Sequence, residues 1–279
     1  MERSARSQSD FRLRKSIDLL LLVQNKLANR SITGLENLDA IHPEESVIIA
    51  VSHTTGFDIP LAVNALGAHM DIAISEQSTH GKMTKEPFAY IGQKIAGSRN
   101  FLPISYSWHG EKKQADRFNP NDSVAMEKAL GFGRNVLVAV HKPLIINSGG
   151  NVVSPRAGYL AAYLAGKSNH RVLPVGVSYE SASNTKYDAL VTIGGPIDLH
   201  GKADVAIIDD LNTKRQSSGL STEEALVMDN QLKRLLGDGG TLLEAVQSLQ
   251  NLNEEYPVID QMYTGQEKST SGRSFPSVR

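Results

Sequence analysis

A histidine and an aspartate that together suit general-base chemistry stand five positions apart in this sequence. His53 and Asp58 lie in the segment Ser-His-Thr-Thr-Gly-Phe-Asp-Ile-Pro. A neutral imidazole near pH 7 accepts a proton from an attacking hydroxyl or amine. A carboxylate on the other ring nitrogen fixes the tautomer and stabilises the imidazolium that forms. The pair therefore predicts a catalytic base, His53, that Asp58 orients.

The sequence on either side of this pair predicts a strand and then a helix. Residues 46–51 are apolar and rich in β-branched side chains, which is typical of a buried strand. His53 follows directly, and ligand sites in open α/β sheets gather just beyond the carboxyl ends of strands. Gly56 permits a tight turn, and Pro60 suits the first turn of a helix. Such a turn would bring the Asp58 carboxylate back to the imidazole.

A purely structural reading of the same two residues stays open. Asp58 precedes an apolar run and is a favourable N-cap for a helix, whatever else it does. His53 in that reading is a hydrogen-bonded histidine at the end of a strand.

Short apolar runs alternate with helical patterns through most of the chain. A short strand and turn are predicted at residues 31–38. Further strands are predicted at residues 46–51, 71–75, 101–104, 135–140, 171–178 and 189–193, and helices at 61–66, 86–96, 123–132, 157–165, 221–236 and 241–252. This alternation predicts an α/β fold with a mainly parallel or mixed central sheet and helices on both faces.

The N-terminal region predicts an amphipathic helix. Residues 1–10 are polar and predicted to be loose, whereas in 11–30 apolar residues recur near one face: Leu13, Ile17, Leu20, Leu21 and Leu27. Basic residues flank this stripe: Arg12, Arg14, Lys15, Lys26 and Arg30. Basic residues beside an apolar face are typical of a helix at a membrane surface. The alternative is a helix that packs on the domain.

Three segments follow from this organisation. Residues 1–30 form the N-terminal helix region, 31–263 the α/β domain, and 264–279 a Ser/Gly-rich tail that is predicted to be disordered.

Composition excludes several classes of protein. The formal net charge is −1, so no overall basic field recruits nucleic acid. The chain has no cysteine, which rules out disulfides and Cys-ligated zinc, and its histidines show no metal-ligand spacing. The polar N-terminus is unlike a signal peptide, and its longest apolar run, 19–23, is too short to span a bilayer. We therefore expect a cytoplasmic protein with peripheral contact, through residues 11–30, at the inner face of the membrane.

Several blocks in order resemble a known family. They are 33–38 (Thr-Gly-Leu-Glu-Asn-Leu), 52–58, 86–92 (Glu-Pro, then Ile-Gly), 101–104 (Phe-Leu-Pro-Ile), 155–158 (Pro-Arg-Ala-Gly), 173–177 (Leu-Pro-Val-Gly-Val) and 193–197 (Ile-Gly-Gly-Pro-Ile). Together they are similar to the glycerolipid acyltransferases, a family that includes the glycerol-3-phosphate and 1-acylglycerol-3-phosphate acyltransferases. The family signature reads Asn-His-x4-Asp, and the resemblance covers roughly residues 31 to 200.

The resemblance implies transfer of a fatty acyl group from a thioester, either acyl-CoA or acyl-carrier protein. The acceptor would be the hydroxyl of a lysophospholipid or a glycerol-phosphate-like lipid, and 1-acylglycerol-3-phosphate O-acyltransferase is the favoured activity. Such enzymes use no metal or redox cofactor. By the same resemblance the turn residues line the substrate site: Thr54, Thr55, Gly56 and Phe57.

Two departures from the family pattern bear on the acceptor. Ser52 stands where the family has Asn, and the family's Phe-Pro-Glu-Gly-Thr-Arg block is replaced by His141-Lys142-Pro143-Leu144. Because that block helps to bind the acceptor's phosphate, other cations are candidates to bind a phosphate or carboxylate here: His141, Lys142, Arg156 and Arg99. The same loss motivates an alternative function, a catalytically inactive relative that binds acyl chains or lipids.

Overall fold

The computed structural model describes the N-terminal helix and about half of the predicted α/β domain, including its central sheet. The described residues are 2–23, 27–52, 57–67, 69–75, 100–104, 120–141, 143–145, 151–153, 156–183 and 186–200, together with 242, 245, 246 and 249. The helices predicted at 86–96 and 221–236 and the tail at 264–279 lie outside these residues. Within 241–252, the four described residues are helical, as predicted.

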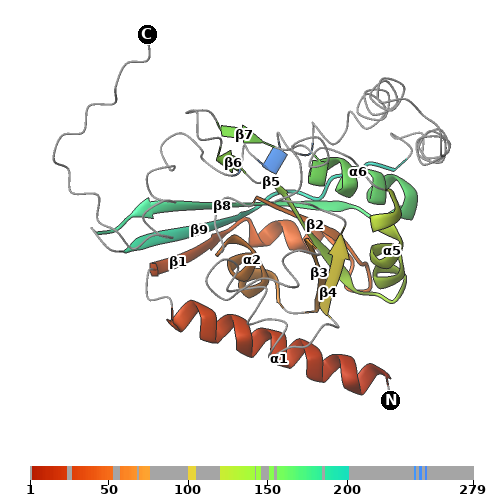
Figure 1. Cartoon of the computed structure of the whole chain (residues 1–279), viewed down its shortest axis with the longest axis horizontal. Helices are drawn as coiled ribbons and strands as arrows, with labels where there is room; N and C mark the ends of the chain where they lie inside the picture. Colours follow the sequence, from red (N-terminus) through yellow and green to blue (C-terminus); the bar gives the residue numbers. More distant parts are fainter. Residues whose placement is uncertain are drawn as a thin grey trace, which may run out of the picture.

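A seven-stranded mixed sheet forms the centre of the molecule (Figure 1). Its order is β1-β9-β8-β2-β5-β3-β4. The strands are β1 (Leu27–Thr33), β2 (Ile48–Ser52), β3 (Met70–Ser75), β4 (Phe101–Ile104), β5 (Asn135–His141), β8 (Val172–Ser181) and β9 (Tyr187–Ile193). Neighbours pair in parallel except β8 and β9, which are antiparallel. The predicted α/β fold class is confirmed.

Helices cover both faces of this sheet, as predicted. Helices α1 (Glu2–Val23) and α2 (Asp58–Leu66) pack on one face, and α5 (Ser123–Gly131) and α6 (Arg156–Ser168) on the other (Figure 1). Two 3-10 turns, η1 (Leu35–Ala40) and η3 (Pro120–Asp122), lie between these elements. Alternate residues of β2 serve the two cores: Ile49 and Val51 face α1 and α2, while Ile48 and Ala50 face α5 and α6.

The segment after β5 folds differently from the sequence prediction. Residues 143–153 contain a two-stranded antiparallel sheet that the periodicity does not reveal. Its strands are β6 (Pro143–Ile145) and β7 (Asn151–Val153). Runs of three residues are too short to show alternation, so this pair of strands has no sequence signal.

The N-terminal helix is displaced from its predicted bounds. It begins at Glu2, so residues 2–10 are helical and not loose as predicted, and it ends at Val23 instead of residue 30. The chain then enters β1, an edge strand that pairs in parallel with β9. Most side chains of β1 are exposed, so it lacks the alternation that marks a half-buried strand. Pairing with β9 therefore overrides the helical pattern, as tertiary context routinely does.

The apolar stripe of α1 packs against the domain. Leu13, Ile17, Leu20 and Leu21 are buried in the core that α1 shares with α2. The packing alternative for this stripe is confirmed, and a different set of apolar residues faces outward: Phe11, Leu19 and Leu22.

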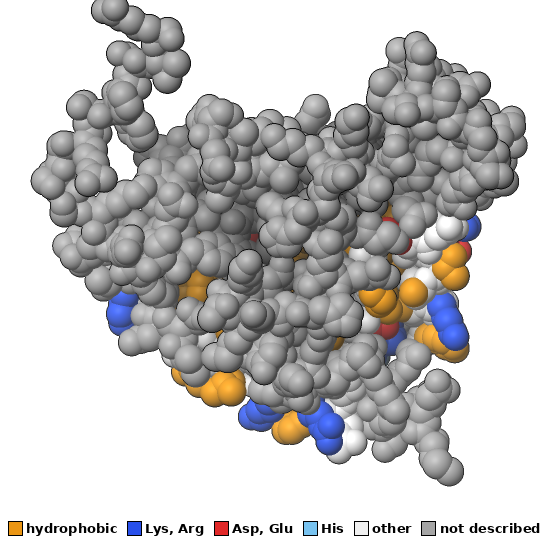
Figure 2. All heavy atoms as spheres, viewed as in Figure 1, with side chains coloured by type: hydrophobic (Ala, Val, Ile, Leu, Met, Phe, Trp, Pro, Cys, Tyr) orange, Lys and Arg blue, Asp and Glu red, His pale blue; other side chains and the backbone are white. Residues whose placement is uncertain are grey.

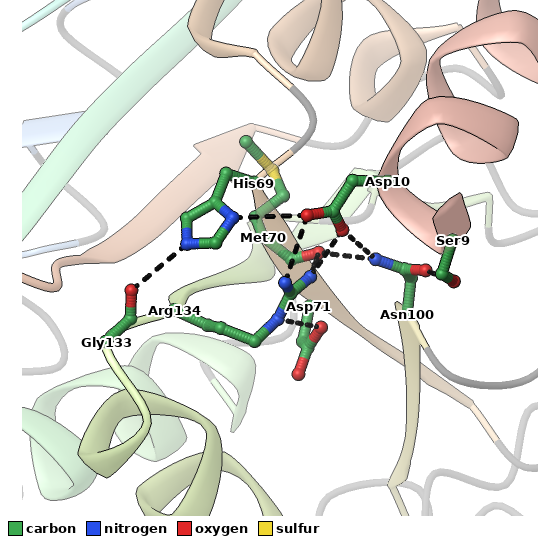
Figure 3. A network of polar contacts seen from close by, with 8 residues as sticks. All are labelled: Ser9, Asp10, His69, Met70, Asp71, Asn100, Gly133 and Arg134. Carbon is green, nitrogen blue, oxygen red and sulfur yellow. Dashed lines mark hydrogen bonds and ion pairs between the residues drawn. The ribbon is translucent and has the colours of Figure 1, made fainter. Parts of the chain in front are cut away.

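A buried ion-pair network also fixes α1 to the sheet (Figure 3). The Arg134 guanidinium donates to both oxygens of Asp10, at 2.8 and 3.1 Å, and through Nε to Asp71 at 2.7 Å. Asn100 donates to the same Asp10 carboxylate at 2.8 Å, and His69 Nδ1 lies 3.1 Å from it. Asp71 and Arg134 stand at the starts of β3 and β5, so the network lies at the amino edge of the sheet.

Candidate functional site

The segment that carries His53 begins at the carboxyl end of the central strand β2. Ser52 is the last residue of β2, which pairs in parallel with β5 on one side and β8 on the other. His53, Thr54, Thr55 and Gly56 lie outside the described residues, and α2 starts at Asp58. The predicted strand before the segment and the predicted helix after it are therefore confirmed. Carboxyl ends of adjacent parallel strands are where ligand sites form in α/β sheets.

Asp58 is completely buried at the first residue of α2, with 0% of its surface exposed. The hydroxyl of Tyr179 donates to its Oδ1 at 2.5 Å. A hydroxyl that donates to an ionised carboxylate makes a stronger hydrogen bond than one between neutral groups. The N-terminus of α2 also favours a negative charge, since the helix dipole is positive there.

The structural reading of Asp58 as a helix N-cap is wrong. The N-cap of α2 is Phe57, which makes no side-chain cap hydrogen bond, and the Phe57 carbonyl accepts the N–H of Leu61 at 2.9 Å. Asp58 is thus inside the helix by one residue. A carboxylate buried there needs partners, because an isolated buried charge is very costly.

Ser52, the residue in the place of the family's Asn, has a defined structural contact. Its hydroxyl accepts the N–H of Val177 at 2.8 Å and is fully buried. The contact continues the association of β2 with β8 beyond their last paired residues, Val51 and Val175. The Ser52 hydroxyl therefore connects the end of β2 to the neighbouring strand β8.

Two other candidate residues stand at the ends of elements that meet the same edge of the sheet as the end of β2. His141 is the last residue of β5 and is the register partner of Ser52. Arg156 is the first residue of α6, which leads into β8, a strand parallel to β2. Since a crossover helix returns the chain to the amino edge, α6 begins at the carboxyl edge. The backbone thus brings positions 52, 58, 141 and 156 to one edge.

The remaining candidate residues are placed elsewhere or lie outside the described residues. Phe57 is buried, 6% exposed, in the core shared with α1 and α2. Lys142 and Arg99 lie outside the described residues. Asn100, which follows Arg99 in sequence, contacts Asp10 and Met70 at the opposite, amino edge. Substrate-binding roles for these positions stay predictions.

Tyr179 is a residue of this site that the sequence reasoning missed. The signal was present, because Leu173, Val175 and Val177 alternate along the predicted strand and Tyr179 is the next residue on the same face. A buried tyrosine hydroxyl usually finds a hydrogen-bond partner. A tyrosine at the end of an inward-facing apolar series therefore points to a polar group beyond the end of the adjacent strand.

Among the side chains that the structure describes, no three His, Asp or Glu residues are grouped so as to hold a metal ion. The described helices include none with the length and apolar character to cross a bilayer.

Comparisons with known proteins find a similarity of structure but none of sequence. The fold is similar to the crystal structure of the 1-acyl-sn-glycerophosphate (LPA) acyltransferase PlsC from Thermotoga maritima. The two share 15% sequence identity at a TM-score of 0.40, over 85% of this chain and 81% of that one. No family model and no curated protein matches the sequence. A likeness of this size carries no functional argument, so the function must be argued from residues of this chain.

Proposed function

We propose that this protein is an acyltransferase that moves a fatty acyl group from a thioester to a hydroxyl acceptor. His53 is the general base and Asp58 orients it. The observation that supports this most is the buried, hydrogen-bonded Asp58 carboxylate at the start of α2, which stands five residues after His53 in the sequence. Ser52 ends β2 and Asp58 begins α2, so the segment between them joins the carboxyl end of a parallel strand to a helix, and ligand sites in α/β sheets form at such ends.

The reaction needs one proton transfer in each direction. The imidazole takes the proton of the acceptor hydroxyl as its oxygen attacks the thioester carbonyl. The tetrahedral intermediate then expels the thiolate, which receives the proton from the imidazolium, so an ester and a free thiol result. Such general-base assistance contributes about 10²- to 10⁴-fold to the rate.

Burial of Asp58 suits its part in this reaction. The carboxylate is shielded from water, so its attraction to an imidazolium is weakened little by solvent screening. The charge on the histidine exists only while the acceptor proton is held. The interaction therefore strengthens in the transition state, as catalysis requires.

The proposed donor is acyl-CoA or acyl-carrier protein, and no metal or redox cofactor enters the reaction. The favoured acceptor is a lysophospholipid such as 1-acylglycerol-3-phosphate. Its phosphate would be bound by cations at the carboxyl edge, where His141 ends β5 and Arg156 begins α6. Lys142 follows His141 in sequence and belongs to the same proposal.

We also propose that the outer face of α1 contacts a membrane surface and so brings the enzyme to a lipid acceptor. Phe11 is 61% exposed and Leu22 71%, while Arg12, Arg14 and Lys15 are exposed beside them. Figure 2 shows hydrophobic and basic side chains next to one another along the lower surface, where α1 lies in Figure 1. Exposed apolar residues among Lys and Arg are typical of interfacial helices. The corresponding location is the cytoplasm, with peripheral contact at the inner face of the membrane.

The test is a matrix of acyl-CoA and acyl-carrier-protein donors against lysophospholipid and glycerol-phosphate acceptors. Products are identified by mass spectrometry. We expect the wild type to form an ester and His53→Ala to lose about 10²-fold or more of that activity, with an unchanged circular dichroism spectrum. Full activity in His53→Ala would refute the mechanism. Tight binding of acyl chains without transfer to any acceptor would instead support the non-catalytic lipid binder.

A further inference from the structure

One strand, β8, contacts both ends of the segment that carries His53. Before the segment, the Ser52 hydroxyl accepts the N–H of Val177; after it, the Asp58 carboxylate accepts the hydroxyl of Tyr179. We infer that Tyr179 is a positioning residue for the proposed base: its hydroxyl holds the Asp58 carboxylate in the orientation that His53 requires. This inference rests on the proposed acyl transfer.

The register of the sheet explains how Tyr179 reaches Asp58. Strand β8 pairs in parallel with β2 up to Val175, opposite Val51, and then continues to Ser181 after β2 has ended. Tyr179 therefore lies beyond the carboxyl end of β2, within hydrogen-bond distance of Asp58 at the start of α2. Its side chain is on the same face as Val175, which is the face that α2 covers.

Burial makes this hydrogen bond effective. Tyr179 is 2% exposed and Asp58 0%, so water does not compete for either group. A hydrogen bond to a charged group in such surroundings contributes more than one between neutral groups. Because a carboxylate is planar, fixing Oδ1 at 2.5 Å from the phenol also fixes the direction in which Oδ2 points.

The phenol acts through Asp58 and has no part in bond making. Loss of the hydroxyl leaves the carboxylate with one fewer donor and with freedom to rotate, so the histidine is oriented less well. Steps that depend on the base should slow, while groups that bind the thioester and the acceptor are untouched. The expected effect is therefore on kcat and not on KM.

The experiment compares Tyr179→Phe with Tyr187→Phe in the full chain. Tyr187 is the matched control, because it is a second buried tyrosine (2% exposed) of the same core, on the neighbouring strand β9. We expect Tyr179→Phe to lower kcat about tenfold, or 1.4 kcal/mol of transition-state stabilisation, with KM for donor and acceptor within about twofold. Tyr187→Phe should keep the wild-type kcat, and thermal unfolding checks that both variants fold.

A double-mutant cycle separates positioning from a general effect on stability. In an Asp58→Asn background the carboxylate is gone, so removal of the Tyr179 hydroxyl should change the residual kcat less than about twofold. A tenfold loss that persists in this background would overturn the inference, because the tyrosine would then act by another route. A kcat for Tyr179→Phe equal to that of Tyr187→Phe would overturn it as well.

A measurement without turnover tests the contact itself. The wild type and Asp58→Asn are labelled with [¹³Cζ]tyrosine, and the eight tyrosine signals are compared by NMR. A marked shift of one signal supports the hydrogen bond; eight unchanged signals would refute it. If the wild type transfers no acyl group to any acceptor, the proposed function and this inference both fail. If the wild type is active and Tyr179→Phe keeps the wild-type kcat, as Tyr187→Phe is expected to do, the inference fails but the proposed function stands.

Discussion

Removal of the Asp10 carboxylate should measurably loosen the attachment of α1 to the domain. Asp10 and Arg134 form a two-pronged ion pair in which the guanidinium is only 3% exposed and the carboxylate 16%. Breaking a buried ion pair by removing one partner costs about 3–5 kcal/mol, because the other charge stays buried. Arg134 retains Asp71 at 2.7 Å, so the remaining charge is partly compensated. We therefore expect Asp10→Asn to lower the free energy of unfolding by about 2–3 kcal/mol.

Two further variants, Arg134→Met and Asp18→Asn, should lower the free energy of unfolding by more and by less than Asp10→Asn, respectively. Arg134→Met leaves two carboxylates, Asp10 and Asp71, without their shared cation, and should cost more than Asp10→Asn, about 3–5 kcal/mol. Asp18→Asn removes a partly exposed carboxylate from the same helix and should cost less than about 0.5 kcal/mol. Urea unfolding followed by circular dichroism gives the three values. A cost for Asp10→Asn no larger than that for Asp18→Asn would refute the reasoning.

The ion pair between Asp10 and Arg134 predicts that the free energy of unfolding depends on pH. Burial alone would raise the pKa of Asp10, but the hydrogen bonds from Arg134 and Asn100 and the charge of Arg134 outweigh burial and lower it. A carboxyl group whose folded pKa is depressed stabilises the protein above its unfolded value, about 4, and this stability is lost as pH falls through the folded pKa. The difference between wild type and Asp10→Asn should thus be complete at pH 6 and shrink below about pH 4. A difference that stays constant from pH 6 to pH 3 would contradict this assignment.

Two further predictions concern the backbone and the membrane face. Gly34→Ala should destabilise the fold by about 2–4 kcal/mol in thermal or urea unfolding, because Gly34 has φ 78° and an added Cβ would meet the Ile193 carbonyl oxygen at 2.0 Å. Gly131→Ala, in the last turn of α5 with open space around it, is the control and should be neutral or slightly stabilising. Phe11→Ser with Leu22→Ser should reduce co-sedimentation with anionic phospholipid vesicles at least severalfold without changing stability, since both side chains are largely exposed. Equal vesicle binding by this variant and the wild type would exclude α1 as the docking face.

The central strands and helices could be predicted because their sequence signals are local. The run 46–51 is buried and rich in β-branched residues, and β2 is found at Ile48–Ser52 with every residue buried. The edge strand β1 could be predicted only in part: residues 31–33 belong to the predicted short strand and turn, whereas residues 27–30 are assigned to the N-terminal helix by their sequence pattern. Its exposed residues carry no period-2 pattern, and what makes it a strand is β9, about 160 residues later in the chain.

The candidate site likewise has a part that local sequence predicts and a part that depends on contacts between distant residues. His53 and Asp58 are close in sequence, so their spacing indicates their chemistry. The partners that hold this segment, Val177 and Tyr179, are more than 120 residues away and depend on the register of β2 with β8. No spacing rule within one sequence reports that register. Only the orientation of Tyr179, as the last in a series of inward-facing residues, could have been inferred beforehand.

The order of the strands has a consequence for synthesis on the ribosome. When residues up to about 150 have emerged, the nascent chain contains the whole of β2 and α2 but none of β8. Asp58 then lacks the phenol that holds its carboxylate, and β2 lacks one of its two neighbours in the sheet. Contacts between such distant residues form slowly, since a long loop must close first. The contact between Tyr179 and Asp58 can therefore form only after most of the chain has been translated.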